Sequence, residues 1–426
     1  MTVVGIPQTE AVRADVRSWL DAHWDPNQTV RVWWEALAES GWAYPTWPVE
    51  WFGKGFDADL AQVVRAELKA AGALAPPHGI AQTMGAPVIL QFGTEEQRER
   101  FIRPIATGVE AWCQFFSEPD AGSDLASLKT RAVRDGEEWI VNGQKVWNSG
   151  TLTSDRGVLP LRTDPDVPKH KGLSFFIIDV QQPEIDIRPI RQLNGEAHFN
   201  ETFFTDARAR DADLIGGLNN GWAVTLATLA NERASYAAGA DYTGGIPAGE
   251  MSGMLDLTCA EAVAQVAATN DGYTAFPLGD SAALIHLASE AGCIEDPTVR
   301  QRIMKLHTMS EVARLTALRA KAAADAGRTP GPESSLGHIA GVNIARATRD
   351  LGLAILGAGG ILVGDDAPLE GAVAMMALTS LVHGIQGGTE QIQRNIVGER
   401  VLGLPKEPQV DRDVAFRDVL SSGRSS

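Results

Sequence analysis

The chain has 426 residues, of which 44% are hydrophobic and 21% charged, so it is long enough for two or three units with substantial cores. Its net charge of −17 at pH 7 argues against the clustered lysines and arginines of a nucleic-acid surface, and we expect no nucleic-acid partner. The three cysteines, Cys113, Cys259 and Cys293, are too few and too widely spaced for a disulfide framework, which fits a reducing compartment.

The sequence shows no targeting or membrane segment. The N-terminal residues turn polar before the apolar core of a signal peptide is formed. The longest nearly apolar run, residues 351–363, is shorter than the roughly 18 residues of a membrane span. We therefore expect a cytoplasmic protein without membrane contact.

The first half of the chain changes from a helical to a strand pattern. From residue 10 to about residue 108, apolar residues recur at helical spacing, and proline and glycine separate the segments. From residue 112 to about residue 204, short alternating segments predict strands, with LSFFIIDV as a buried one. Within WIVNGQKVW, the pair Asn142-Gly143 predicts the two-residue turn of a hairpin.

Helical spacing returns from about residue 221 to residue 401. Two long amphipathic helices are predicted there, over residues 297–326 and 335–356. The glycine run GAGG at 357–360 lacks the surrounding strand-turn-helix unit of a dinucleotide loop, so we interpret it as a turn between helices. The tail after Pro408 is expected to be loosely held.

Two motifs carry mixed chemistry at fixed spacing. The first combines WCQFFSEPDAGSD at 112–124 with KVWNSG at 145–150, and the second is GGTEQIQRNIVGERVLGLP at 387–405. They closely resemble the flavin-binding strands and the last active-site loop and helix of the acyl-CoA dehydrogenase family. About thirty positions of mixed chemistry are far more specific than a short glycine motif. The resemblance covers nearly the whole chain.

The resemblance implies an α+β fold with three domains. An N-terminal α-helical domain over residues 1–111 is followed by a small β domain over 112–218, which carries flavin and acyl-CoA contacts. A C-terminal helical domain over 219–426 resembles a four-helix bundle.

FAD is the cofactor that the resemblance implies. Its isoalloxazine ring needs an apolar wall, a hydroxyl for atom N5 and backbone donors for its pyrimidine edge and phosphates. By position in the motif, Phe116 and Ser117 are expected at the pyrimidine side, Trp147 on a ring face, Ser149 at N5, and Ser123 near the pyrophosphate or the pantetheine arm. Taken singly, the two aromatic residues also fit an ordinary core, and the serine at 123 fits a turn cap.

The second motif supplies further flavin contacts at Thr389 and Gln391, again by resemblance. A metal site is not expected, because the eight histidines show no ligand spacing and no Cys-x-x-Cys pair exists.

The reaction of this family needs a base. Removing a proton next to a thioester carbonyl requires a carboxylate in a dry pocket, where desolvation raises its pKa, and donors for the developing enolate oxygen. Many members carry this Glu in a Tyr-Glu-Gly-Thr sequence, but the matching residue here is Gly387. A second arrangement in the family has the Glu on a helix directly before an Arg, and LANERASYAAG places Glu232 before Arg233 in this way. The resemblance therefore implies Glu232 as the base with Arg233 beside it, while the backbone N–H of Gly387 can still bind the thioester oxygen.

Two alternatives to this assignment stay open. Glu232 also fits a solvated helix position, although the apolar and small residues around it are a poor setting for one. Glu390, three residues after the vacated position, is the rival base, and its expected role is a surface ion pair.

The sequence departs from the family pattern in two places. An Arg and a Gln that reach the FAD of a neighbouring subunit in many members are missing from residues 289–297 and at Ala354, although Arg300 or Arg302 can replace one of them. Residues 236–280 are longer and richer in Gly and Ser than the usual helix, which predicts a remodelled pocket wall that accepts a bulky acyl group.

The expected function is FAD-dependent α,β-desaturation of an acyl-CoA thioester to a trans-2-enoyl-CoA, with electron-transfer flavoprotein as the electron acceptor. The alternatives are a non-catalytic or partner subunit of a heteromeric acyl-CoA dehydrogenase and a flavin oxidase of the same fold. The expected assembly is a homodimer, a homotetramer or a heterotetramer with a sister subunit.

Overall fold

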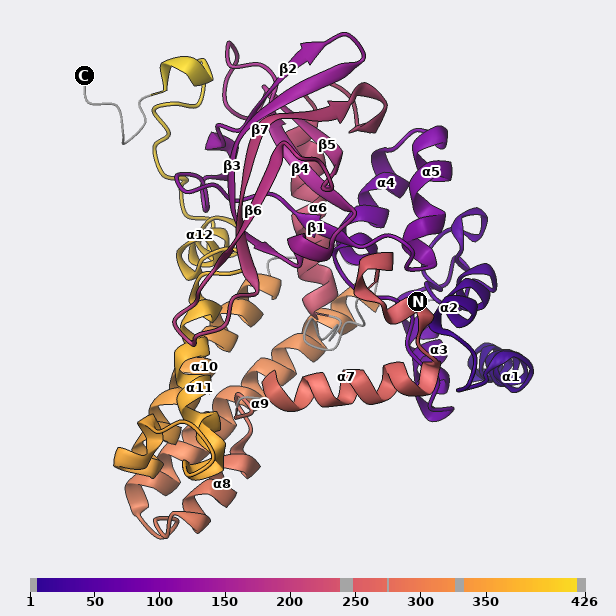
Figure 1. Cartoon of the computed structure of the whole chain (residues 1–426). Coiled ribbons are helices and arrows are strands. Elements are labelled where there is room, and N and C mark those ends of the chain that lie inside the picture. Colours follow the sequence, from indigo (N-terminus) through magenta and orange to yellow (C-terminus); the bar gives the residue numbers. More distant parts are fainter. Residues whose placement is uncertain (1–5, 238–247, 274–275, 326–332, 420–426) are drawn as a thin grey trace. The chain divides into compact units, whose positions relative to one another are not determined.

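The computed structural model describes residues 6–237, 248–273, 276–325 and 333–419, and it contains two compact units (Figure 1). One unit comprises residues 2–191, 197–269 and 409–426. The other comprises residues 192–196 and 270–408. The predicted order of helices, strands and helices is confirmed, and the fold is α+β.

The first unit begins with a helical layer. Its helices are α1 (Ile6–His23), α2 (Val30–Glu39), α3 (Ala58–Ala70), α4 (Ala86–Phe92) and α5 (Glu95–Ala106). Local signals fix their ends, because Thr29 caps α2 by accepting from Val32 N–H, and Thr94 and Gln97 form a reciprocal capping box on α5. The apolar face of α2 buries Trp33 completely, which anchors this layer.

An eight-stranded sheet follows. Its strands are β1 (Trp112–Gln114), β2 (Arg131–Asp135), β3 (Glu138–Ser149), β4 (Arg156–Arg162), β5 (Leu173–Asp179), β6 (Ile185–Ile190), β7 (Phe199–Arg210) and β8 (Leu214–Ile215). The order is β6-β7-β3-β2-β4-β5-β8, and β1 pairs in parallel with β4. The predicted strand LSFFIIDV is β5, and Phe175 and Phe176 are buried on its opposite faces.

The predicted hairpin at Asn142-Gly143 is wrong, because β3 runs straight through it. The pair forms a bulge against β7, where the Asn142 side chain exchanges hydrogen bonds with Asp206. Gly143 allows a close approach, since a Cβ there would lie 2.5 Å from the Thr130 hydroxyl oxygen. The turn that joins β2 to β3 contains Gly136 instead, with φ +67°.

Helix α6 (Gly221–Ala237) packs against β5 and α4. After a gap in the described residues, two short turns over 250–256 lead to α7 (Cys259–Tyr273). Glu250 is bound by Arg31 at 2.7 Å, and Leu255 joins the core of the N-terminal helices. Residues 254–266 of segment 236–280 therefore pack against these helices, whereas Phe276 belongs to the core of the other unit and residues 238–247 lie outside the described residues.

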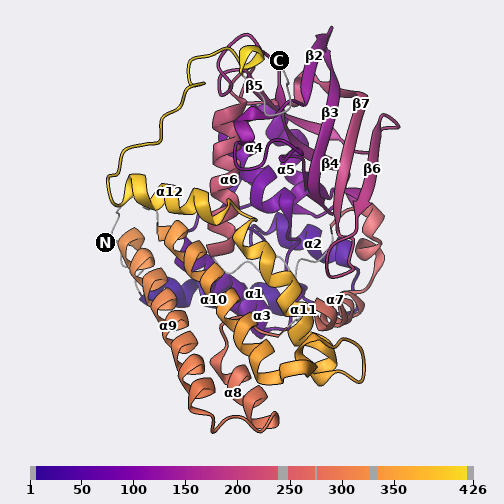
Figure 2. The same ribbon diagram turned by 90° about the vertical axis from the view of Figure 1, so that its left-hand side faces the viewer.

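The second unit is helical (Figure 2). It contains α8 (Ser281–Glu290), α9 (Pro297–Asp325), α10 (Glu333–Leu356), α11 (Ala372–Thr379) and α12 (Glu390–Arg400), with the end of α7. The two predicted long helices are confirmed as α9 and α10, which pack together around Leu306 and Leu351, and the GAGG run is a turn. No helix within the described residues is long and apolar enough to span a membrane.

The tail is not loosely held over its described part, which corrects the expectation for residues after Pro408. Residues 411–418 are bound to the β-domain loop 163–172 through backbone hydrogen bonds, such as Phe416 N–H to Val167 O at 2.9 Å. The turn Phe416–Asp418 belongs to the first unit.

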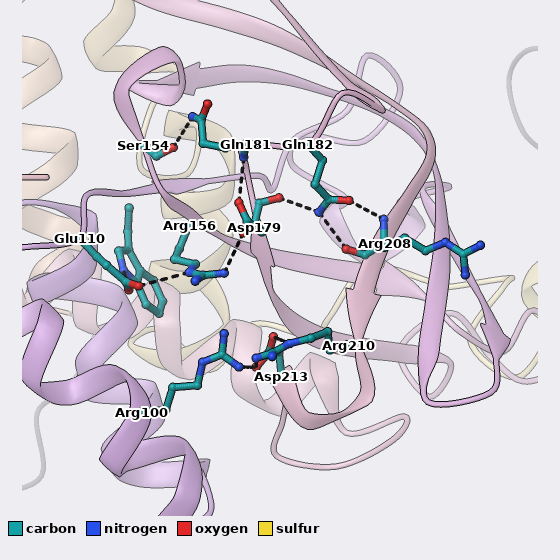
Figure 3. Close-up of polar contacts among 11 residues, drawn as sticks. Arg100, Glu110, Ser154, Arg156, Asp179, Gln181, Gln182, Arg208, Arg210 and Asp213 are labelled. Atoms are coloured by element: carbon teal, nitrogen blue, oxygen red, sulfur yellow. Dashed lines mark hydrogen bonds and ion pairs between the residues drawn. The ribbon is translucent and has the colours of Figure 1, made fainter. Parts of the chain in front are cut away.

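Ion pairs join α5 to one end of the sheet (Figure 3). Asp213 is nearly buried and accepts hydrogen bonds from Arg100 of α5 and Arg210 of β7, with distances of 2.8 to 3.0 Å. Arg156 lies between Glu110 and Asp179 at 3.4 and 3.3 Å. The cavity of about 220 Å³ at this end is therefore lined by arginines whose charges are compensated.

A buried ion pair fixes the loop after β1. The Lys145 ammonium, fully buried in β3, lies 2.9 Å from Glu118 and donates to Phe116 O at 3.0 Å. The Glu118 carboxylate also accepts from the backbone N–H groups of Lys129 and Thr130. Burial acts to raise the pKa of Glu118, but Lys145 and the hydrogen bonds outweigh it and hold the pKa below its usual value.

We predict that Lys145→Met strongly destabilises the protein, because it leaves the Glu118 carboxylate buried without a counter-charge. Breaking one partner of a buried pair costs about 3–5 kcal/mol, and breaking an exposed pair costs at most about 1 kcal/mol. Urea unfolding followed by fluorescence measures the change, with Arg188→Gln, which breaks the exposed Arg188–Asp186 pair, as the control. Equal unfolding midpoints for the two variants would contradict this role.

Candidate active site

A second bulge in β3 presents Trp147 and Ser149 to the outside. The strand register against β7 shifts between Val146 and Asn148, and Trp147 takes the left-handed conformation with φ +64°. Asn148 points inward, where its amide donates to Gln114 O at 2.9 Å and accepts from the Thr202 hydroxyl at 3.0 Å. Because the strand is held by this buried amide, the residues on either side of it are exposed.

Trp147 combines strain with exposure. Its side chain is 58% exposed, and its ring meets the edge of the Phe199 ring, with centroids 6.0 Å apart. A bulky residue with positive φ is uncommon and marks a place where the surroundings impose the conformation. An ordinary core tryptophan is thereby excluded for this position.

The loop after β1 lies beside this bulge. Val146 N–H donates to Ser117 O at 2.9 Å, so the two parts of the first motif are in direct contact. Ser117 is half-buried, and Ser123 is exposed in the turn before Asp124. The structure thus brings Ser117 next to the strand that carries Trp147.

Phe116 differs from its expected position at a ligand surface. Its side chain is 5% exposed and packs edge-on against Phe175 in the main core. Burial is the more favourable place for this ring, since an apolar surface removed from water contributes about 25 cal/mol per Å². Only the backbone of Phe116 is left to serve a ligand, and its carbonyl already accepts from Lys145.

Glu232 continues the buried face of α6. Thr225 and Thr228 are fully buried on that face, and Glu232 follows four residues after Thr228. The Glu232 side chain is half-buried, and burial raises the pKa of its carboxyl, opposed by the charge of Arg233. A fully solvated helix position would not raise the pKa of the carboxyl in this way.

In the second unit, Gly387 and Gly388 precede α12 with φ +66° and +91°. Thr389 caps the helix by accepting from Ile392 N–H, and Gln391 is exposed on its first turn. Among the described residues of the second unit, the nearest atom to a Cβ on Gly387 belongs to His338, at 3.9 Å. A glutamate there would have to adopt a strained left-handed backbone.

Glu390 is not suited to be a base. Its side chain is nearly buried, which corrects the expected surface position, and it is paired with Arg346 at 2.8 Å and Arg394 at 2.5 Å. These two arginines hold the pKa of Glu390 below its usual value. A carboxylate stabilised in this way is a weak proton acceptor.

Glu118, Lys145 and Asn148 are site-forming residues that the sequence reasoning missed. They hold the candidate ligand-binding residues in place without being exposed themselves. The available signal was their position inside the two halves of the first motif. A metal centre is not indicated, since no group of three His, Cys, Asp or Glu side chains is suitably placed in the part of the chain that the structure describes.

Comparisons with known proteins show the family to which the chain belongs. Models of the acyl-CoA dehydrogenase N-terminal, middle and C-terminal domains match residues 7–109, 113–207 and 264–402. The chain is 34% identical to acyl-CoA dehydrogenase IpdE1 of Mycobacterium tuberculosis over 88% of both chains. It is 35% identical to acyl-CoA dehydrogenase FadE34 of the same organism over 87% of this chain, but spans only 46% of that relative.

Solved structures resemble the whole chain. The structure titled Tcur3481-Tcur3483 steroid ACAD has a TM-score of 0.68 and 25% identity, covering 96% of this chain and all of the other. The ChsE4-ChsE5 complex from Mycobacterium tuberculosis has a TM-score of 0.65 and 26% identity, with the same coverage. The chain therefore belongs to the acyl-CoA dehydrogenase family of flavoprotein oxidoreductases.

Proposed function

We propose that this chain desaturates an acyl-CoA thioester between its α and β carbons, with Glu232 as the base that removes the α-proton. The observation that carries the proposal is the position of Glu232 on the buried face of α6, where burial raises the pKa of its carboxyl. The more common base position of the family is Gly387, which has no side chain. Both features support the proposal that the protein belongs to the subgroup of the family whose catalytic Glu lies on the helix after the β domain.

Each catalytic group has one task in this proposal. The Glu232 carboxylate accepts the α-proton, and its raised pKa makes it a stronger acceptor than an exposed glutamate. The charge of Arg233 opposes this rise of the pKa and favours the ionised form of the carboxyl. The N–H of Gly387 donates to the thioester oxygen, which becomes more negative as the proton leaves.

FAD fits the residues around the bulge in β3. The exposed Trp147 offers an apolar face of the kind that a planar ring requires, and Ser149 offers a hydroxyl on the same strand. Ser117, Ser123, Thr389 and Gln391 would hold other parts of the cofactor. When bound, FAD supplies the acceptor for the hydride from the β carbon, and we propose electron-transfer flavoprotein as the later electron acceptor.

The substrate proposed here is a bulky or polycyclic acyl-CoA. Residues 236–280 differ from the usual helix of the family, and the titles of solved structures similar to this chain name a steroid acyl-CoA dehydrogenase. The described part of this segment has two short turns over 250–256 before the regular helix α7.

An oligomer is supported by an apolar stripe on α9. Met304, Val312, Leu315 and Leu318 lie within about a third of the helix circumference, and each is at least half exposed. The opposite face packs against α10. A stripe of this kind is typical of a helix that binds another subunit.

The partner is proposed to be either a second copy or a sister subunit, which can supply the missing FAD contacts.

Arg302 is the better substitute for the missing Arg within this chain. It lines a shallow cleft of about 560 Å³ together with Lys305, whereas Arg300 is paired with Glu295 at 3.3 Å.

Glu232→Gln should slow flavin reduction by an acyl-CoA by about 10²-fold or more, because the amide keeps the shape but cannot accept the proton. FAD content should be unchanged. Stopped-flow absorbance of the flavin measures the rate, and Glu390→Gln, which changes the rival carboxylate, should be much less impaired. A wild-type rate in Glu232→Gln together with a large loss in Glu390→Gln would transfer the role to Glu390.

A bulky acyl pocket predicts a preference for branched and sterol-derived CoA thioesters over straight medium chains. The expected kcat/KM ratio is at least about tenfold, since a poorly filled apolar pocket loses roughly 1–3 kcal/mol. Steady-state turnover with a panel of thioesters of matched solubility measures it. A preference for straight medium chains is the opposite result and would exclude this substrate class.

Replacing Val312 and Leu315 together by glutamate should dissociate the oligomer, because two charges would be buried in its interface. Light scattering after size exclusion measures the mass against the 45.5 kDa of one chain. Leu193→Glu, at a side chain that is 72% exposed and outside α9, is the control. An unchanged mass in the double variant would exclude the α9 stripe as an interface.

The molar ratio of FAD to protein in the same preparations distinguishes a second copy of this chain from a sister subunit as the partner. About one FAD per chain in a stable homo-oligomer would refute the sister subunit. Low occupancy that rises on co-expression with a related chain would support it.

A further inference from the structure

The C-terminal segment 409–419, here called the strap, is bound to the β-domain loop 163–172. Phe416 N–H donates to Val167 O at 2.9 Å, and Arg417 N–H donates to Pro165 O at 3.0 Å. Pro168 and Ala415 form an antiparallel bridge next to the Phe416–Val167 contact. The strap therefore follows the loop as a short paired segment, drawn in yellow beside the β domain in Figure 2.

Arg162 links the strap to the start of the loop. Its guanidinium lies 3.7 Å from the centre of the Phe416 ring, and its side chain is almost completely buried. It donates to Lys169 O and to Ala126 O, both at 2.6 Å. Burial lowers the pKa of Arg162 to about 10, so the group remains charged at neutral pH.

Lys169 connects the strap to the first motif. Its ammonium donates to Asp411 of the strap at 2.7 Å and to Asp124 at 2.8 Å, and its side chain is only 11% exposed. Asp124 directly follows Ser123, and its carboxylate also accepts from the Ser127 hydroxyl. One buried cation therefore holds the strap, the loop and the EPDAGSD turn together.

We propose that the strap is a positioning element for the Ser123–Asp124 turn and that Lys169 is the positioning residue between them. The ligand is a pyrophosphate-bearing nucleotide, either FAD or coenzyme A, at that turn. This rests on the proposed function, which puts Ser123 near the pyrophosphate or the pantetheine arm.

Two physical effects act on such a ligand, and they can be separated. Lys169 neutralises Asp124, which would otherwise repel a phosphate next to it. The strap fixes Lys169, because Asp411 and the paired backbone leave its side chain few other conformations. Asp411→Asn weakens the fixation of Lys169 by the strap and leaves Lys169 able to neutralise Asp124. Because one negative charge is lost, the variant also makes the local charge more positive. If the strap acts by positioning Lys169, this variant should bind the nucleotide more weakly than the wild type. If only the local charge acts, it should bind the nucleotide equally well or more tightly.

The experiment measures nucleotide affinity in the full-length protein. FAD binding is followed by fluorescence after removal and readdition of the cofactor, and binding of free coenzyme A is followed by calorimetry on the FAD-loaded protein. We expect Lys169→Met and Asp411→Asn each to weaken one of the two nucleotides by about tenfold, the loss expected for a charge-assisted hydrogen bond. The nucleotide that is affected identifies the ligand of the turn.

Arg417→Gln is the matched control within the strap. It breaks the exposed Arg417–Asp166 pair at 2.8 Å and leaves Lys169 untouched, so both affinities should stay within about twofold of the wild type. Wild-type affinity of Asp411→Asn for both nucleotides would overturn the proposal, even if Lys169→Met does not fold. If the wild-type protein binds neither FAD nor coenzyme A, the proposed function fails as well, which is a distinct outcome.

Discussion

The buried ion pair between Lys145 and Glu118 is the interaction on which the candidate active site depends. Two charges are removed from water, which is unfavourable unless both are fully compensated. The compensation comes from each other, from the carbonyl of Phe116 and from two backbone N–H groups. These contacts tie the loop to β3 at several points. The pair therefore sets the position of Ser117 relative to the bulge in β3.

In the bulge of β3, a buried polar side chain determines the exposed position of its neighbour. Asn148 satisfies its amide in the interior, and the neighbouring Trp147 has to adopt a left-handed backbone and an exposed side chain. Such strain persists only where the surrounding contacts outweigh it. Covering such an exposed apolar ring is favourable, because it removes apolar surface from water. The exposure of the ring therefore agrees with a planar ligand on that face.

The same relation between burial and chemistry separates the two candidate bases. Glu232 is half-buried beside one arginine, and burial raises the pKa of its carboxyl. Glu390 is nearly buried between two arginines, and their charges lower its pKa. The pKa values of the two carboxyl groups are thus shifted in opposite directions. Neither the residue type nor the position in a motif predicts this difference.

The sequence by itself determined the α+β order of elements, the strand β5, the long helices α9 and α10 and the family, because periodicity and motif spacing are properties of the linear chain. The Asn-Gly turn failed as a local signal, since the hydrogen bonds of Asn142 with Asp206 and the close approach of Gly143 to Thr130 fit the pair into a bulge of the continuous strand β3. The motif predicted Trp147 and Ser149 as ligand-binding residues. In the structure the Phe116 side chain lies in the core, and the strap is bound to the β-domain loop, although it was expected to be loosely held. Only the tertiary structure decided these points, because burial and charge compensation depend on residues far apart in the sequence. Lys169 illustrates this, since Asp124 and Asp411 meet at its ammonium only after folding.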